Sequence, residues 1–376
     1  MRIDAVAARP LQITFKPAFR HASAERSSTQ AIWVEARCGD HVGFGEGCPR
    51  GHATGESVGS ALAFVAGHVD EWRERIRFIQ DLGDYVTRQA ATIDEHPAAW
   101  CAVELALLDL LGKVGGLAVE RLIGTPSVGG SFYYTAVLGD APPAAFEALL
   151  AAYARAGMRQ YKVRLSGDVE RDGAKLDALT RAGVHAPAVR ADASNLFADA
   201  DAAIEHLRAL RYPFAAVVEP VRAGDMEGMR RIARELGTRI VLDESLARAD
   251  QLEGLRDHAA LWIGNLRVSK MGGLLRSVSF TREAQRIGLE LIVGADFGET
   301  SLLTRVGMTI ADLAGRSLYA QEGAFGTHLL ERDVVEKPLM FGREGKLLLL
   351  HGFAPRGLGM RVTEPSITGT TPRFHA

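Results

Sequence analysis

The chain has 376 residues, which is more than one ordinary hydrophobic core holds and predicts two domains, one of them large enough for a barrel of about 250 residues. Its 44 Lys and Arg against 46 Asp and Glu give a net charge of −2, so the expected partner is a small molecule rather than nucleic acid or an anionic membrane. The three cysteines form no Cys-x-x-Cys pair, which excludes a disulfide framework and a zinc knuckle.

Residues 1–125 are predicted to form an α+β domain. The N-terminus lacks the apolar core of a signal peptide and no later stretch approaches about 18 uninterrupted apolar residues, so we expect a cytoplasmic protein. Alternating apolar residues predict strands over 3–15, 31–37 and 41–47, and a helical repeat predicts a helix over 98–116. Gly43, Gly45 and Gly47 do not match a dinucleotide fingerprint and are interpreted as part of a hairpin and loop.

From residue 126 to residue 321, short apolar runs alternate with helical segments. Six of the runs end in polar, mostly ionisable groups, and successive groups lie 24 to 30 residues apart by subtraction of their positions. That interval holds one strand, one loop and one helix, which predicts an α/β barrel with its chemistry at the carboxyl ends of the strands. An eighth strand is predicted near 317–321. The groups are Lys162 with Arg164, Asp192, Glu219, Asp243 with Glu244, Lys270, and Asp296 with Glu299.

Three consecutive strand ends carry a carboxylate: Asp192, Glu219 and Asp243. Mg²⁺ prefers such oxygen ligands, and three of them leave positions open for substrate oxygens and water. The alternative is that each acid caps the helix that follows it. Three acids in succession favour one Mg²⁺ per active site, with Mn²⁺ as the other candidate ion.

Lysines flank these carboxylates. Lys162 and Lys270 are expected to face each other across the mouth of the barrel, where a lysine near a divalent ion can act as an acid or a base. The alternative is that each lysine is solvated or paired with a neighbouring acid. We favour the catalytic interpretation for both.

The chain resembles the enolase superfamily and, within it, the muconate lactonizing enzyme subgroup, which includes dipeptide epimerases and N-acylamino acid racemases. The resemblance extends over nearly the whole chain. The motifs that carry it are FRHASAER at 19–26, ATGE at 53–56, AVELALLDLLGK at 102–113, the strand-end groups, and RGLGM at 356–360. No histidine ends the sixth or seventh strand, which argues against the mandelate racemase branch.

This resemblance implies a (β/α)₇β modified TIM barrel over 126–321. It also implies an α+β capping domain built from residues 1–125 and the C-terminal segment 322–376. It assigns Mg²⁺ to Asp192, Glu219 and Asp243, an acid/base role to Lys270, and a place near the substrate oxygens to Lys162. A homo-oligomer is expected.

Two departures from the subgroup bear on the reaction. The usual Lys-x-Lys of the second strand is Lys162-Val163-Arg164 here, and because arginine stays protonated, Arg164 is a poor base but a good partner for an enolate. The usual Asp-x-Asp of the eighth strand is replaced by a single acid, Glu322. An N-blocked amino acid or an acidic dipeptide would lose less by this change than a substrate with a free ammonium.

Other candidates for substrate binding are Asp296 and Glu299, which either touch substrate or support Lys270, and Arg20 and Arg50 in the early loops, which either meet a distal anion or are solvated. The predicted function is a Mg²⁺-dependent isomerase that removes the α-proton of a carboxylate substrate through an enediolate intermediate. The leading reaction is epimerisation or racemisation of a dipeptide or N-acylamino acid. The alternatives are a one-base cycloisomerase, an acid dehydratase, and a metal-binding barrel without catalysis.

Overall fold

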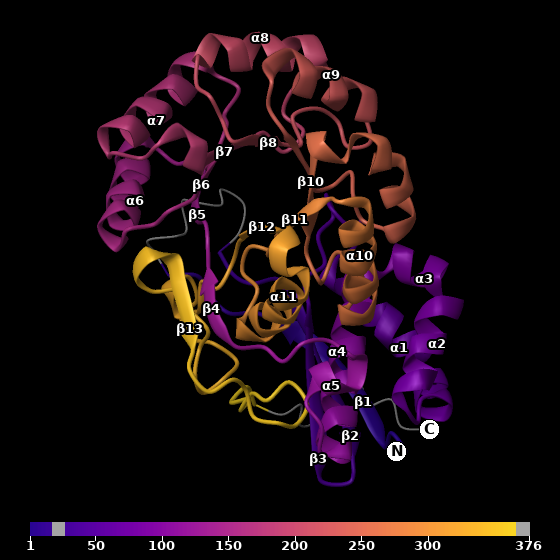
Figure 1. Ribbon diagram of the computed structural model, residues 1–376. Coiled ribbons are helices and arrows are strands. Elements are labelled where there is room, and N and C mark those ends of the chain that lie inside the picture. The colour runs from indigo at the N-terminus through magenta and orange to yellow at the C-terminus, as the bar shows by residue number, and fades with distance from the viewer. Residues whose placement is uncertain (17–26, 366–376) are drawn as a thin grey trace.

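The computed structural model describes residues 1–16 and 27–365 and places a curled sheet of parallel strands beside a smaller α+β part (Figure 1). The smaller part begins with an antiparallel sheet in the order β1-β2-β3. Its strands are β1 (Ala5–Leu11), β2 (Ala31–Cys38) and β3 (His41–Gly47). The alternation read from the sequence buries Val6 and Ala8 on one face of β1, and Leu11 at its end is also buried. The three strands predicted for this region are therefore confirmed.

The glycines of β3 permit close packing of this strand on a helix. Gly43, Gly45 and Gly47 lie on one face of the strand, and a Cβ atom on any of them would lie between 1.9 and 2.0 Å from a carbonyl oxygen of α4 (Pro97–Gly115). No larger residue could occupy these positions without moving the helix. The G-x-G-x-G spacing therefore reflects packing of a strand on a helix.

Five helices complete the N-terminal part. The predicted helix over 98–116 is α4, which is buried along most of its length and ends at Gly116 with φ of +66°, the left-handed conformation that favours glycine. Ser57 caps α1 by accepting a hydrogen bond from the Ser60 amide. The other helices are α1 (Val58–Arg75), α2 (Ile79–Arg88), α3 (Ala90–Glu95) and α5 (Val119–Ile123).

The larger part is an eight-stranded parallel sheet in the unbroken order β5 to β12, as in a TIM-barrel-like fold. Figure 1 shows its helices on the outside of the curled sheet. The strands are β5 (Ala136–Leu138), β6 (Tyr161–Arg164), β7 (Val189–Asp192), β8 (Ala216–Val218), β9 (Ile240–Leu242), β10 (Trp262–Leu266), β11 (Glu290–Val293) and β12 (Leu318–Gln321). The helices between them are α6 (Pro143–Ala156), α7 (Val169–Arg181), α8 (Ala200–Leu210), α9 (Met226–Leu236), α10 (Leu274–Ile287) and α11 (Ser301–Ala314), with a 3₁₀ segment over Ala249–Leu261.

The structure refines the predicted barrel at its first strand. The stretch before the first helix of the barrel divides into β4 (Gly130–Tyr133) and β5. β4 pairs in antiparallel register with β13 (Lys346–Leu349), outside the parallel sheet. The Thr135 amide donates to the Gln321 carbonyl, which brings the start of β5 beside the end of β12. The eighth strand predicted at 317–321 is confirmed as β12.

The C-terminal segment contacts both parts of the chain. The Leu358 amide donates to Asp109 of α4, while the Leu358 carbonyl accepts from Arg305 of α11. A β-bridge joins Phe15 to Leu330. The division at residues 125 and 321 stays a prediction, with which these contacts agree. None of the helices within 1–16 and 27–365 has the length and apolarity needed to cross a bilayer.

Candidate active site

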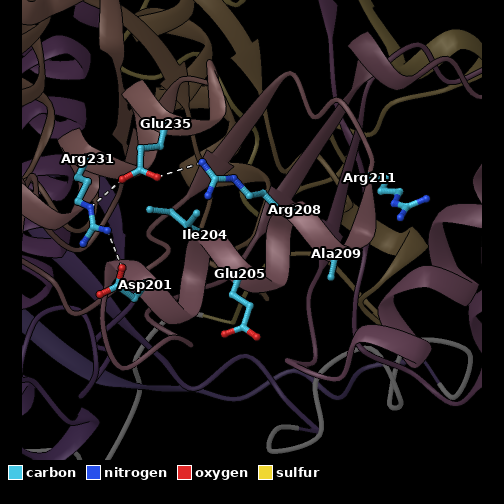
Figure 2. A pocket seen from close by; sticks show the side chains of 8 residues that line it. All are labelled: Asp201, Ile204, Glu205, Arg208, Ala209, Arg211, Arg231 and Glu235. Carbon is cyan, nitrogen blue, oxygen red and sulfur yellow. Dashed lines mark hydrogen bonds and ion pairs between the residues drawn. The ribbon is translucent and has the colours of Figure 1, made fainter.

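One hollow on the molecule lies away from the strand ends. It occupies about 740 Å³ between α8 and α9 on the outside of the sheet and is open to solvent (Figure 2). Four of its charged side chains pair with one another, because Arg231 bridges Asp201 and Glu235, and Glu235 also accepts from Arg208. None of the strand-end groups singled out from the sequence lines it.

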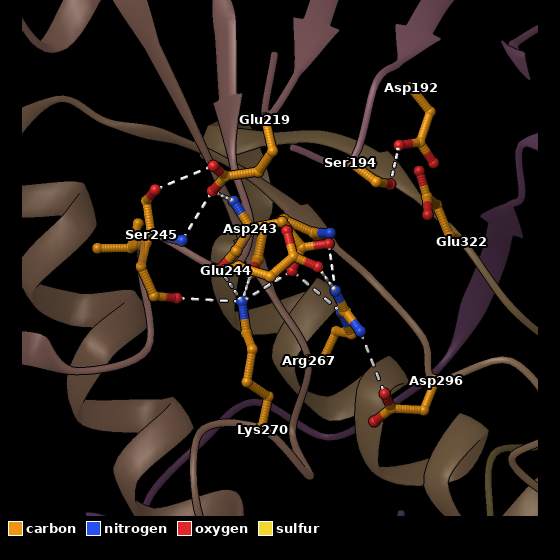
Figure 3. Close-up of polar contacts among 12 residues, drawn as sticks. Asp192, Ser194, Glu219, Asp243, Glu244, Ser245, Arg267, Lys270, Asp296 and Glu322 are labelled. Atoms are coloured by element: carbon orange, nitrogen blue, oxygen red, sulfur yellow. Dashed lines mark hydrogen bonds and ion pairs between the residues drawn. The ribbon is translucent and has the colours of Figure 1, made fainter. Parts of the chain in front are cut away.

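The carboxyl ends of the parallel strands gather the groups singled out from the sequence. Arg164 and Asp192 are the last residues of β6 and β7, Glu219 directly follows β8, and Asp243 directly follows β9. Since neighbouring strands run in the same direction, these side chains reach one mouth. Figure 3 shows Asp192, Glu219 and Asp243 at this end of the sheet.

Glu219 is the most buried of the three acids and no cationic side chain pairs with it in the described part of the chain. Its carboxylate accepts hydrogen bonds from the Asp243 amide at 2.7 Å, the Ser245 amide at 2.7 Å and the Ser245 hydroxyl at 2.9 Å. Burial, with the nearby Glu244 carboxylate, raises the pKa of Glu219 to about 7. Its backbone φ of +38° lies in the left-handed region, a strained conformation for glutamate that is typical of functional sites.

Asp192 faces cations from the neighbouring strand. Its carboxylate accepts from the Ser194 hydroxyl at 2.5 Å and lies 3.6 Å from the Lys162 amine and 3.7 Å from the Arg164 guanidinium. The Arg164 side chain is 44% exposed at this edge. Asp192 therefore has one hydroxyl contact and two longer ion pairs around it.

Asp243 is enclosed by two cations, Arg267 and Lys270. Burial by itself would raise the pKa of Asp243, but the two positive charges outweigh it and hold that pKa below its usual range. Asp243 therefore stays ionised in this surrounding.

Lys270 is buried beside Asp243, and its side chain is 1% exposed. Its amine donates to the carbonyls of Asp243 at 2.5 Å, Asn265 at 2.9 Å and Leu246 at 3.0 Å, and to the Asp243 carboxylate at 2.9 Å. These bonds join the loop after β9 to strand β10. The acid/base role expected of Lys270 stays a prediction.

Arg267 occupies the strand-end position that the sequence reading gave to Lys270. It directly follows β10, as Glu219 and Asp243 follow their strands, and the sequence run RVSK contains it. Its guanidinium donates to Asp243 at 3.1 Å, Asp296 at 3.2 Å and Glu244 at 3.4 Å. Burial lowers the pKa of Arg267, but these carboxylates outweigh burial and raise it well above its usual range.

Glu322 and Lys162 form a buried pair at the opening of the barrel interior. Glu322 accepts from the Lys162 amine at 2.5 Å and from Arg190 at 3.1 Å. Burial lowers the pKa of Lys162, but Glu322 and Asp192 outweigh it, so the net shift is upward. For Glu322, the charges of Lys162 and Arg190 outweigh burial and lower its pKa. A substrate ammonium would have to compete with both cations for Glu322.

Two further candidates, Asp296 and Glu299, lie in the loop after β11. Asp296 pairs with Arg267, and its amide donates to Glu299 at 3.1 Å. Burial, followed by the charges of Asp296 and Glu46, raises the pKa of Glu299 well above its usual value. Glu299 therefore sits at the mouth as a carboxyl group that favours its neutral form.

Arg50 is not a free anion-binding group. It is 4% exposed and donates to the carbonyls of Pro49 at 2.8 Å, Gln30 at 2.9 Å and Phe297 at 3.1 Å. These bonds join the loop after β3 to the loop after β11, and the substrate-binding role expected of Arg50 stays a prediction. Arg20 lies outside the described residues.

The donor set at the mouth fits a hard divalent cation in its chemistry. Three carboxylates end consecutive strands, and Glu219 carries a desolvated charge that a cation would stabilise. In the present arrangement no three acidic, histidine or cysteine side chains within 1–16 and 27–365 lie close enough to share an ion. Asp192 pairs with Lys162 instead, and Asp243 pairs with Arg267, as Figure 3 shows for Asp243.

Comparison with known proteins gives consistent matches. Residues 145–365 match the family described as enolase C-terminal domain-like. The chain is 25% identical over 308 residues to a hydrophobic dipeptide epimerase from Enterococcus faecalis, covering 80% of this chain and 84% of the relative. It is 28% identical over 331 residues to an L-Lys-D/L-Arg epimerase from Methylococcus capsulatus, covering 87% and 90%.

The fold is similar to that of a dipeptide epimerase from Cytophaga hutchinsonii, solved with Mg and the dipeptide D-Ala-L-Val. The TM-score is 0.83 at 21% identity, covering 98% of both chains. At this identity the likeness concerns the fold.

Proposed function

Because the chain belongs to the enolase C-terminal domain-like family, as its sequence motifs predicted, we propose that it is a Mg²⁺-dependent isomerase acting on the carbon next to a substrate carboxylate. The reaction removes the α-proton and passes through an enediolate. The leading substrates are dipeptides and N-acylamino acids, in line with the names of the relatives. Mn²⁺ is the alternative ion.

The observation that carries this proposal is the row of carboxylates Asp192, Glu219 and Asp243 at consecutive strand ends, flanked by cations. These three side chains would hold the ion, which would supply Lewis-acid stabilisation of the charge that develops on the substrate carboxylate. The unpaired and desolvated state of Glu219 is the feature that an ordinary helix-capping acid would not have.

The chain's own residues divide the remaining work. Arg164 is half-exposed at the mouth and permanently charged, so it would attract and orient an anionic substrate without exchanging its proton. Lys162 is the one of the two predicted catalytic lysines whose amine faces Asp192 and Glu322 rather than backbone carbonyls. We assign removal of the α-proton to Lys162. One lysine, rather than two, then exchanges a proton with the substrate.

The position of Glu322 narrows the substrate. Its two oxygens are bonded to Lys162 and Arg190, so no free carboxylate of this residue awaits an ammonium group. A substrate whose amino group is acylated avoids this competition. N-acylamino acids and acidic dipeptides are therefore favoured over dipeptides with a neutral side chain and a free N-terminal ammonium.

A metal-binding barrel without catalysis is the second candidate. It is favoured by the arginines at positions 164 and 267, which cannot serve as bases, and by the enclosed amine of Lys270. The two candidates differ in whether Lys162 exchanges a proton with bound substrate.

The deciding experiment is α-deuterium incorporation from D₂O, measured by mass spectrometry with a panel of dipeptides, N-acylamino acids and hydroxy or lactone acids. Each substrate is incubated with Mg²⁺ and with EDTA. Metal-dependent exchange on one substrate class supports the proposal, and the chirality of the product separates epimerisation from one-sided exchange. Absence of exchange and of product across the panel, with Mg²⁺ bound, would favour the non-catalytic barrel. The matched variant is Lys162→Met, which should abolish exchange while retaining the metal.

A further inference from the structure

Arg267 makes an unusual set of contacts for a residue at the mouth of the barrel. Its side chain is 11% exposed and donates to carboxylates from two different loops, those after β9 and β11. Two of its three nitrogens, Nε and Nη2, reach Asp243, Nε at 3.1 Å and Nη2 closer; Nη2 also donates to Glu244 and Nη1 donates to Asp296. Figure 3 shows this guanidinium among the three acids.

The acid that Arg267 holds most fully is one of the proposed metal ligands. A guanidinium bonded through two nitrogens takes up both oxygens of a carboxylate, and that arrangement is among the stronger ion pairs in proteins. A divalent ion needs at least one of the same oxygens with a free lone pair. A metal at Asp243 would therefore share these oxygens with the guanidinium, whose positive charge opposes a second cation at the same carboxylate.

Glu219 provides the contrast within the same site. Glu219 accepts from the Asp243 amide and from the amide and hydroxyl of Ser245, and no cation of the described residues contacts it, whereas Asp243 is paired with Arg267 and Lys270. Of the three proposed ligands, one thus lacks a positive partner and another is already neutralised by the protein. At Asp243, Arg267 supplies the positive charge that a metal ion would otherwise supply.

We propose that Arg267 is an internal competitor for the divalent cation: it occupies Asp243 in the metal-free protein and thereby sets the affinity of the site for metal. This inference rests on the proposed function, because it requires that a metal binds here. It goes further in assigning to one residue the control of how tightly the metal is held.

Two other acids would keep Arg267 paired when a metal binds at Asp243. Asp296 and Glu244 are not proposed ligands, and each already accepts one hydrogen bond from the guanidinium. When Asp243 turns to the metal, these two carboxylates keep the arginine charge compensated inside the site. Lys270 also donates to the Asp243 carboxylate, at 2.9 Å, while three backbone carbonyls hold its amine in place.

The test is direct metal binding, measured by calorimetry with Mg²⁺ and by electron paramagnetic resonance with Mn²⁺, on protein stripped with EDTA. The variants are Arg267→Met, which keeps an unbranched chain and removes the charge, and Arg248→Met as the matched control. Arg248 is 44% exposed and pairs with Asp94 and Asp250. Arg267→Met is expected to bind metal on the order of tenfold more tightly, the equivalent of one charged hydrogen bond, while Arg248→Met binds as the wild type does.

The outcomes separate this inference from the proposed function. If the wild type binds metal and Arg267→Met binds equally or more weakly, Arg267 is not a competitor and the inference is wrong. If neither protein binds Mg²⁺ or Mn²⁺, the proposed metal site itself fails. A purely structural role would lower the thermal stability of the variant without tightening the metal.

A second variant keeps the test decisive if Arg267→Met does not fold. Arg267→Lys retains the charge but has a single nitrogen, which cannot span both oxygens of Asp243 as the guanidinium does. Its metal affinity is expected to lie between those of the wild type and Arg267→Met, a few-fold above the wild type. Affinity equal to or below that of the wild type would overturn the proposal.

Discussion

Substitution of Lys270 by methionine distinguishes a structural lysine from a catalytic one. In the structure its amine donates to three backbone carbonyls and to Asp243, and the side chain is 1% exposed. Methionine fills a similar volume but donates nothing, so Asp243 loses a buried cation and the carbonyls of Asn265 and Leu246 lose their donor. Breaking a buried pair in this way destabilises a protein by about 3–5 kcal/mol.

The measurement is the urea midpoint and the thermal midpoint of Lys270→Met, with Lys337→Met as the control because Lys337 is exposed. A loss of about 3–5 kcal/mol corresponds to a fall in Tm of roughly 10 °C for a domain of this size. The control should unfold as the wild type does. A Lys270→Met protein of unchanged stability that fails to catalyse deuterium exchange would refute the structural role and restore the acid/base role expected from the sequence.

Three further changes test the site. Glu322→Gln removes the carboxylate 2.5 Å from the Lys162 amine, so the raised pKa of Lys162 should fall; because Lys162 must lose its proton to act as the base, the rising, acidic limb of the exchange rate should move to lower pH, and a limb that stays in place contradicts the assignment. Glu219→Gln should weaken Mg²⁺ binding in calorimetry by at least roughly 100-fold, the upper range for loss of a residue that only supports a ligand. Because the Glu219 pKa is raised to about 7, ionising it in the folded protein is unfavourable, so stability of the metal-free wild type should fall as pH rises from 4.5 to 7, and Glu219→Gln should show a smaller fall in Tm over this range. Asp172→Asn changes a buried carboxylate of α7 that accepts from the Ser166 amide at 2.8 Å and from Lys175 at 2.9 Å; because Lys175 also donates to the Arg164 carbonyl at 2.8 Å, the variant should loosen the strand end that carries Arg164 and raise KM more than it lowers kcat, and a loss in kcat alone would contradict this role.

The repeated pattern of the barrel could be read from the sequence because it depends on local chemistry. Apolar runs of strand length, helices closed by glycines such as Gly157 and Gly288, and acids at a constant interval each follow from short-range preferences. Because neighbouring strands are parallel, their carboxyl ends lie together whatever conformation the loops adopt. For this reason Asp192, Glu219 and Asp243 reach the same mouth, as predicted.

The sequence did not show which partner each charged side chain contacts. Lys270 and Arg267 are three residues apart in one segment, and the sequence offered no reason to prefer the arginine. β10 ends at Leu266, so the next residue, Arg267, faces the neighbouring acids. The Lys270 amine instead donates to the carbonyls of Asp243, Leu246 and Asn265. Arg50 likewise depends on carbonyls from Gln30 and Phe297, which are distant in the chain.

The sequence alone determined the fold class, the family and the row of carboxylates, because periodicity, strand-end position and residue type are properties of short segments. The tertiary structure decided which cation meets which acid: Arg267 on Asp243, Lys162 and Arg190 on Glu322, and no cation on Glu219. The physical reason is that pairing and desolvation depend on distances of a few ångströms between segments far apart in the chain, and those distances exist only after the sheet has curled and packed.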